Sequence, residues 1–191
     1  KWNQVVKKTK NLINTGEDIA VYYNLLGLSL SKLDKNQDAE KFFIDGINKF
    51  PNEVSLRSNI ALIQIKLKKL DKAEQNLNEA IKINSEDIYT LFAIGKLKRE
   101  QQQYEEAAKV LKKVCEKDVK FADALTLLGQ TYLDLGHLTN KKEFYELAEK
   151  NLLIHSKLFP LIGGTDYVLS TFTDYALNDF HQKIMLNKIK N

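Results

Sequence analysis

The sequence has few of the residues that break up or cross-link a chain. Its 191 residues include 8 glycines, 2 prolines and one cysteine, Cys115. A sheet protein needs turn residues between many short strands, so this scarcity argues against an all-β fold. A single cysteine excludes an intrachain disulfide and is compatible with a reducing compartment. Charged and apolar residues alternate over long stretches, which predicts helices throughout the chain.

Long apolar runs are also missing. No run approaches the roughly 20 residues of a transmembrane helix, and no signal peptide is visible. We therefore expect no membrane span, and the location stays open with the cytoplasm slightly favoured. Because the chain begins with Lys1 and not with methionine, we expect a segment of a longer protein, whose upstream part could carry a targeting signal or a further domain.

The charge is only weakly one-sided. The formal net charge is +4, and the lysines are scattered among aspartates and glutamates. This mixture is typical of solvated helix surfaces and not of a nucleic-acid footprint. We expect no specific nucleic-acid partner.

Residue groups that carry catalysis or bind metals are not recognisable. His137, His155 and His181 lack the spacing of metal ligands. Cys115 has no identifiable histidine partner that would make it a nucleophile. The pair at 163–164 lacks the strand and the Lys-Ser/Thr of a phosphate-binding loop. The sequence therefore predicts no enzyme and no cofactor.

The sequence contains an internal repeat with one constant period. Positions 27, 61, 95 and 129, for example, are equally spaced along the chain. Four series of positions follow this period: Gly27, Ala61, Gly95 and Gly129; Ala39, Ala73 and Ala107; Phe43, Leu77 and Leu111; Gly46, Ala80 and Val114. We interpret each period as two antiparallel helices that cross closely at the small residues. Because one pair cannot bury its apolar faces alone, stacked neighbours must supply the core.

These positions resemble the tetratricopeptide repeat, whose pattern is an aromatic residue, Leu-Gly, Tyr, Ala, Phe and Pro. The first repeat matches it with Tyr23, Leu26, Gly27, Leu30, Ala39, Phe43 and Pro51. The resemblance implies an all-α fold, a right-handed superhelical solenoid of antiparallel helix pairs. Its array of about four repeats would cover 20–160, divided as 20–53, 54–87, 88–121 and 122–160. The RNA-binding pentatricopeptide repeat fits less well. Its period is typically one residue longer, so the repeated positions would shift visibly from one repeat to the next.

The fourth repeat departs from the period. Continuing at the same step places Lys141 where a small residue belongs, whereas a shift of seven places Ala148, Leu152 and Pro160 at matching positions. A shift of seven makes about two helical turns, so it keeps the same face inward. We therefore predict an insertion around 136–143, as an extended loop or a lengthened helix end.

Both ends are predicted to differ from the regular repeats. Residues 1–19 include Val5 and Leu12 at places that the period reserves for a second helix. We interpret this segment as the second helix of a partial repeat, or as an N-terminal capping helix. Residues 161–191 are predicted to form a C-terminal capping helix region.

The resemblance also implies a concave groove lined by the first helix of each repeat. In the family this groove commonly receives an extended peptide or a helix. Its lining is expected at first-helix positions that do not contact neighbouring helices. The predicted peptide-binding residues are Asn24, Leu28, Ser58, Leu62, Ile65, Tyr89, Phe92, Lys96, Arg99, Thr126 and Gln130.

The middle of this predicted groove is apolar. Its apolar members are Leu28, Leu62, Ile65 and Phe92. Exposed apolar patches usually mark contact sites, so we expect an apolar or amphipathic peptide, with Lys96 and Arg99 holding an acidic flank. In the alternative, these side chains pack against neighbouring helices or beneath the terminal helix of the array.

Some members of the family hold the C-terminal carboxylate of heat-shock chaperones in a polar clamp. Asn59 matches the second-repeat asparagine of that clamp. Asn24 and Leu28 replace its first-repeat lysine and asparagine, and Tyr89 and Ala93 replace its third-repeat cations. One match among five positions argues against this activity.

The sequence therefore predicts a protein-interaction scaffold or adaptor with a protein or peptide partner. An alternative is a substrate-recognition or regulatory domain of a larger multidomain enzyme. Homo-oligomerisation through the ends of the array is a further alternative, since open solenoid ends can stack.

Overall fold

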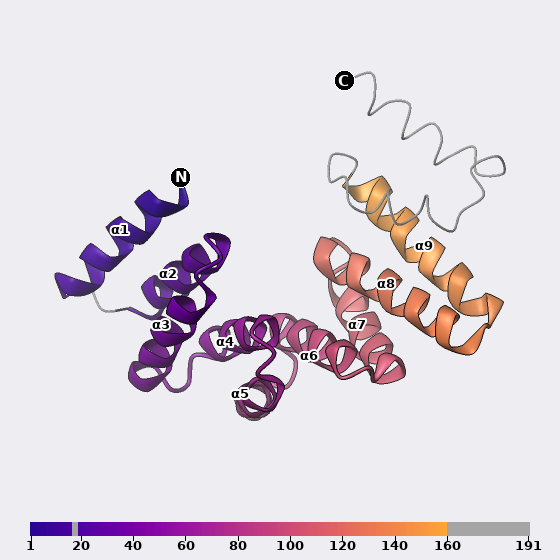
Figure 1. The fold of residues 1–191 in the computed structure, drawn as a ribbon, viewed down its shortest axis with the longest axis horizontal. Coiled ribbons are helices and arrows are strands. Elements are labelled where there is room, and N and C mark those ends of the chain that lie inside the picture. Colours follow the sequence, from indigo (N-terminus) through magenta and orange to yellow (C-terminus); the bar gives the residue numbers. More distant parts are fainter. Residues whose placement is uncertain (17–18, 160–191) are drawn as a thin grey trace, which may run out of the picture. The chain divides into compact units, whose positions relative to one another are not determined.

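The computed structural model describes residues 1–16 and 19–159, and every regular element in that part of the chain is an α-helix (Figure 1). The helices are α1 (Trp2–Asn14), α2 (Ala20–Lys32), α3 (Asn36–Lys49), α4 (Val54–Lys66), α5 (Leu70–Ile83), α6 (Ile88–Glu100), α7 (Tyr104–Lys117), α8 (Ala122–Thr139) and α9 (Lys142–Leu158). The chain is thus an all-α helical repeat solenoid. The predicted cap at 161–191 lies outside the described residues.

The helices belong to two units. The first unit covers residues 1–101 and contains α1 to α6, and the second unit covers 102–191 and contains α7 to α9 among its described residues. In the first unit α2 contacts both α1 and α3, and α4 contacts α3, α5 and α6 (Figure 1). The first helices α2 and α4 are therefore packed against the second helix of their own repeat and against the helix that precedes them.

Small residues allow the two helices of a repeat to cross closely, as the repeated series predicts. A Cβ atom added to Gly27 of α2 would overlap the Phe43 ring of α3. A Cβ atom added to Gly46 of α3 would lie 2.8 Å from Cβ of Tyr23. Larger side chains at these places would push the helices apart, so the glycines set the separation within the first repeat.

The turns between paired helices repeat one backbone geometry. Asp34, Lys68 and Gln102 each adopt a left-handed conformation, with φ of 57°, 58° and 61°. At the first of these turns the N–H of Lys35 donates to the carbonyl of Leu30 at 2.9 Å, which closes the end of α2. These turns use a conformation that glycine usually supplies, so the period is kept in the backbone even where the side chains differ.

The apolar core of the first unit forms two clusters. One surrounds Leu26, Phe43 and Ile60 between α2, α3 and α4, and the other surrounds Ile65 and Leu97 between α4, α5 and α6. A helix such as α4 contributes to both clusters, because its neighbours cover it on several sides. No helix pair of the first unit buries its core alone.

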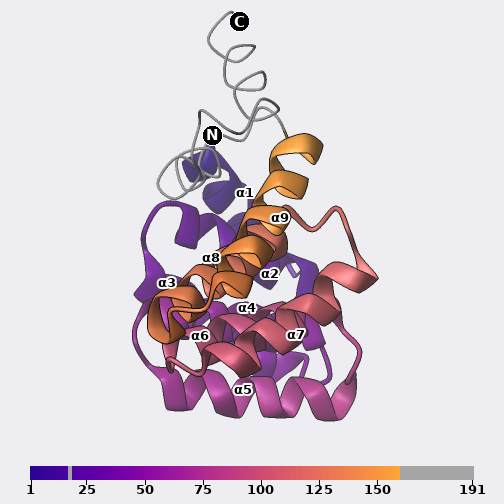
Figure 2. The same ribbon diagram turned by 90° about the vertical axis from the view of Figure 1, so that its right-hand side faces the viewer.

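The second unit contains the long pair α8 and α9, which run side by side (Figure 1 and Figure 2). A Cβ atom added to Gly129 would lie 2.6 Å from Leu152, and Ala148 is fully buried. Gly129 and Leu152 therefore pair as Gly27 and Phe43 do, in the register shifted by seven. Both helices are lengthened, to 18 and 17 residues against 13 and 14 in the first repeat.

The insertion lengthens the ends of α8 and α9 and does not form an extended loop, and residues that flank it pack against each other. The ring of Tyr132 stacks on that of Phe144 with 6.3 Å between centroids. A Cβ atom added to Gly136 would lie 2.9 Å from Tyr145. The insertion thus continues the close helix crossing of the fourth pair by further turns.

Candidate peptide-binding site

Polar side chains join the first helices of the first unit. Asn24 of α2 donates to the Ser55 hydroxyl of α4 at 2.6 Å and accepts from the Asn59 amide at 2.9 Å. The hydroxyls of Ser58 on α4 and Thr90 on α6 share a hydrogen bond of 2.7 Å. These bonds hold α2, α4 and α6 side by side, because each links helices that are about one repeat apart in sequence.

Apolar side chains accompany this polar ladder. Leu28 on α2 is 43% exposed and Tyr89 on α6 is 61% exposed. Leu62 on α4 and Phe92 on α6 are half-buried. The first helices therefore carry accessible apolar surface at these predicted groove positions.

Two of the predicted lining residues are buried, and the prediction that their side chains face a groove was wrong. Ile65 lies in the core cluster with Leu77 and Leu97. Ser58 is buried between α4 and α6, where its hydroxyl bonds to Thr90 and also donates to the carbonyl of Val54 at 3.1 Å. Both errors have one cause. Helix α6, the first helix of the next repeat, covers more of α4 than the helical periodicity of the α4 sequence indicates.

Asn24 and Asn59 hold the helices together through their amides. Because the amide of Asn59 donates to Asn24, the one residue that matches the chaperone clamp is engaged within the protein. Asn24 is half-buried and bonded to two side chains of α4. Each of the two amides donates a hydrogen bond to a side chain of the neighbouring first helix.

The predicted cations lie on α6. Lys96 and Arg99 are both half-buried. On the neighbouring helix, Lys66 donates from Nζ to the Ser31 hydroxyl at 3.0 Å. These residues add positive charge to the ends of the first helices.

The remaining predicted residues lie in the other unit. Thr126 and Gln130 are half-buried on α8, one helical turn apart. The structure thus places the other predicted residues on α2, α4 and α6 of the first unit, and these two on a separate unit.

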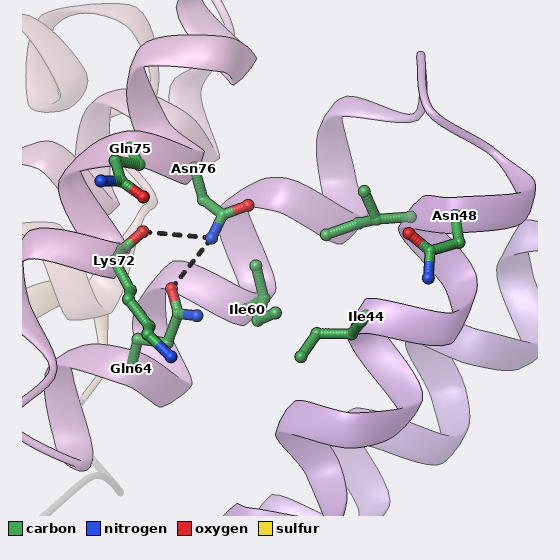
Figure 3. Close-up of a pocket in the computed structure, with 8 residues that line it drawn as sticks. Ile44, Asn48, Ile60, Gln64, Lys72, Gln75 and Asn76 are labelled. Carbon is green, nitrogen blue, oxygen red and sulfur yellow. Dashed lines mark hydrogen bonds between the residues drawn. The ribbon is translucent and has the colours of Figure 1, made fainter.

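A hollow that the sequence did not predict lies between second helices α3 and α5 (Figure 3). Its volume is about 270 Å³, below the roughly 300–1,000 Å³ of typical small-molecule sites. Three isoleucines and several amides surround it, and Ile60 of α4 lies between the lining side chains of α3 and α5. The lining residues are Ile44, Ile47, Asn48, Ile60, Gln64, Lys72, Gln75 and Asn76. The sequence signal for this hollow was Ile44, an apolar residue that belongs to none of the four repeated series. In the structure its side chain is 43% exposed.

A chain of polar contacts runs from this hollow into the protein. The Asn76 amide donates to Gln64 at 3.0 Å, as Figure 3 shows, and the Gln64 amide donates to the Glu40 carboxylate at 3.3 Å. Lys69 forms an ion pair of 2.5 Å with the same carboxylate. Glu40 and Gln64 are both buried, so each depends on these partners for its hydrogen bonds.

Replacing Glu40 by alanine is expected to lower the free energy of unfolding by about 1–3 kcal/mol, because the buried Gln64 amide loses its acceptor. Urea unfolding followed by circular dichroism measures the loss. Glu79→Ala is the control, because it removes an exposed ion pair with Lys82 and should leave the unfolding midpoint unchanged. Equal midpoints for both variants would show that the Glu40 contacts contribute nothing.

Metal-binding clusters and membrane-spanning helices are both missing from the described part of the chain. Within residues 1–16 and 19–159, no cluster of three or more His, Cys, Asp or Glu side chains is placed to hold a metal ion. No helix in the same ranges is both long and apolar enough to cross a membrane.

Sequence comparison identifies the repeat. A family model described as tetratricopeptide repeat matches residues 54–87, and one described as TPR repeat matches residues 95–136. The chain belongs to the tetratricopeptide repeat family. The first match has the same bounds as the second repeat that the sequence period defines.

A curated relative shares this tetratricopeptide sequence at lower identity. The BBSome complex member BBS4 of Bos taurus is 26% identical over 151 residues, which cover 75% of this chain. The match covers 29% of that protein, so this tetratricopeptide chain spans less than a third of its relative's length.

Solved tetratricopeptide structures have the same fold. YrrB, described as a TPR protein with an unusual peptide-binding site, superposes with a TM-score of 0.59 at 19% identity, covering 88% of this chain and 84% of YrrB. The first TPR of Spaghetti (RPAP3) bound to the HSP90 peptide SRMEEVD gives a TM-score of 0.56 at 25% identity, covering 61% of this chain and 95% of that one.

Proposed function

We propose that this chain is a protein-interaction scaffold whose first helices bind an apolar or amphipathic peptide segment of a partner protein. The observation that carries the proposal is the exposure of Leu28 and Tyr89 beside a polar ladder whose two asparagine amides donate to side chains of the protein itself. Exposed apolar groups gain from burial by a ligand, and tyrosine is a frequent anchor at interfaces. The tetratricopeptide neighbour bound to an HSP90 peptide supports a peptide as the type of ligand.

The chemistry of the first helices favours an apolar peptide centre over a terminal carboxylate. Leu28, Tyr89 and Ala93 stand at three positions where the chaperone clamp has polar or charged groups. Asn59 is bonded to Asn24. Lys96 and Arg99 on α6 would instead hold an acidic residue that flanks the apolar centre of the peptide.

A phage-displayed library of random peptides, each about 12 residues long, selected on the wild-type chain, tests the proposal. We expect enriched peptides to carry an apolar centre with an acidic flank. The Kd of a synthetic enriched peptide should rise at least about tenfold in the variant Leu28→Asp/Tyr89→Asp, because two apolar contacts are replaced by charge. Both replaced side chains are exposed, so the variant should fold.

The matched control is Ile44→Asp/Ile83→Asp, which changes side chains of similar exposure, 43% and 42%, on second helices α3 and α5. It should bind the selected peptide as the wild type does. If the control loses binding and the first-helix variant keeps it, the hollow beside Ile44 is the peptide site and the proposal is wrong. A selection that enriches no sequence would also contradict it.

A further inference from the structure

The hollow between α3 and α5 lies at a place that the repeat also forms between α1 and α3. Helix α1 holds the position of a second helix, because Ile13 of α1 lies one repeat before Ile47 of α3 and both pack against the core cluster around Leu26. The two places, one before α3 and one after it, are therefore equivalent in the repeat and can be compared position by position.

Between α1 and α3 an aromatic ring occupies this place. Phe42 of α3 packs against the core cluster, and Nζ of Lys10 on α1 lies over its ring, 5.0 Å from the centroid. One repeat later, the positions of Lys10 and Phe42 are those of Ile44 and Asn76. Both of these residues line the hollow. Two repeat positions whose side chains meet in the first place thus border an open space in the second.

The second place stays open because Asn76 is short and its amide bonds inward. The amide donates to Gln64 of α4 at 3.0 Å and to the carbonyl of Lys72 at 3.1 Å, so the side chain is held beside α4 and α5 (Figure 3). Gln64 is held in turn by the buried Glu40. The space that remains is about 270 Å³. The second place therefore has a hollow where the first has an aromatic ring.

The lining suits an apolar side chain that is carried by a peptide backbone. Its three isoleucines offer apolar surface. Asn48 and Gln75 carry exposed side-chain amides, and an amide can both donate to and accept from a peptide group. None of the described residues that line the hollow is an aspartate or a glutamate, and their one charged member is Lys72. The isoleucines would bury the side chain while the amides bond to the backbone beside it.

We propose that the hollow binds the ring of a phenylalanine from an extended segment of a partner protein. The fit is shown by Phe42, whose ring occupies the equivalent place. The volume is small for a free organic ligand, whereas single aromatic side chains in pockets are frequent anchors of protein interfaces. The backbone of the segment would lie between Asn48 of α3 and Gln75 of α5. This site is separate from the first-helix site proposed above, so one chain can hold two peptide segments at once.

The probe comes from a phage-displayed library of random peptides, each about eight residues long. The selection uses the variant Leu28→Asp/Tyr89→Asp, in which the proposed first-helix site is removed, so the hollow is tested by itself. We expect enriched peptides to share one aromatic residue, because a single ring fills the space. Enrichment of no shared sequence, or of peptides without an aromatic residue, would overturn the proposal.

A synthetic enriched peptide is then measured on the full chain by fluorescence anisotropy. Asn76→Phe introduces the residue found one repeat earlier and should raise the Kd at least about tenfold, because the new ring occupies the hollow. Asn78→Phe makes the same change at an exposed position of α5 outside the lining and should bind as the wild type does. Alanine in place of the aromatic residue of the peptide should weaken binding to the wild type at least about tenfold. Equal affinities of the two variants would place the peptide elsewhere on the chain.

Ile44→Asp keeps the test decisive if circular dichroism shows that Asn76→Phe does not fold. Its side chain is 43% exposed, and the new carboxylate would lie against the bound ring, so the Kd should rise at least about tenfold. Ile83→Asp changes a side chain that is 42% exposed on α5 and does not line the hollow, so it should leave binding unchanged. Full affinity of Ile44→Asp would contradict the assignment.

The source of the ring is tested without any peptide. Sedimentation of the wild-type chain at several concentrations should show no association that Ile44→Asp abolishes. If such association appears, a second copy of the chain occupies the hollow, and the assignment to a partner protein is wrong.

Discussion

Truncation of Phe43 to alanine is expected to lower the free energy of unfolding by about 3–5 kcal/mol. The ring is fully buried at the centre of the first repeat, and Gly27 has no side chain that could fill the space. Urea unfolding followed by circular dichroism measures the loss. A cost below about 1 kcal/mol would show that the neighbouring helices close the cavity.

The pairing of Gly27 with Phe43 can be tested without leaving a large cavity. Gly27→Ala alone should cost about 1–3 kcal/mol, because the added Cβ overlaps the ring. Adding Phe43→Leu reproduces the pair Ala61 and Leu77 of the second repeat. The double variant should therefore be more stable than the sum of the two single changes predicts, by about 0.5–3 kcal/mol. Strict additivity would mean that the two positions do not share one contact.

Cys115 is expected to react with iodoacetamide at pH 8 about 100-fold more slowly than a cysteine with an ordinary pKa, since only the thiolate reacts. Burial, and then the charges of Glu116 and Asp118, raise the pKa of this thiol from 9.0 to about 11. A rate measured at several pH values should keep rising up to about pH 11. This behaviour is opposite to that of an activated nucleophile.

The control places an exposed cysteine on the same helix, as Lys109→Cys in a Cys115→Ser background, and this thiol should react at the ordinary rate. The raised pKa also has a consequence for stability. Between pH 9 and 11 the unfolded chain loses the thiol proton that the folded chain retains, so stability should fall as pH rises through that window. If Cys115 reacted with iodoacetamide as fast as the control thiol, the raised pKa of Cys115 would be contradicted.

The sequence was sufficient to predict contacts that depend on small residues. The spacing of Gly27, Phe43 and Gly46 predicts a close crossing of two helices, because a crossing of that kind admits only certain side chains. The same reasoning found the register of Gly129 and Leu152 across the insertion. Such contacts are set within one helix pair, so a local pattern contains the information.

The candidate site was less predictable, because it depends on how neighbouring repeats cover each other. Helical periodicity places Ser58 and Ile65 on the groove side of α4, but α6 and the core around Leu97 cover them. Leu28 and Tyr89 did prove to be exposed. The hollow beside Ile44 depends on the separation of α3 and α5, which no single helix specifies. Whether the predicted residues bind a peptide stays a prediction.

The lengthened pair α8 and α9 bears on how such an array changes length over evolution. Its additional residues amount to about two turns, so the side chains beyond them return to the same face and the contact of Gly129 with Leu152 is kept. Insertions of about one turn in each helix preserve this phase, whereas an insertion of half a turn would rotate the buried stripe toward water. On either side of the loop at Asn140, α8 and α9 can therefore each lengthen by one helical turn. The rest of the array keeps its register.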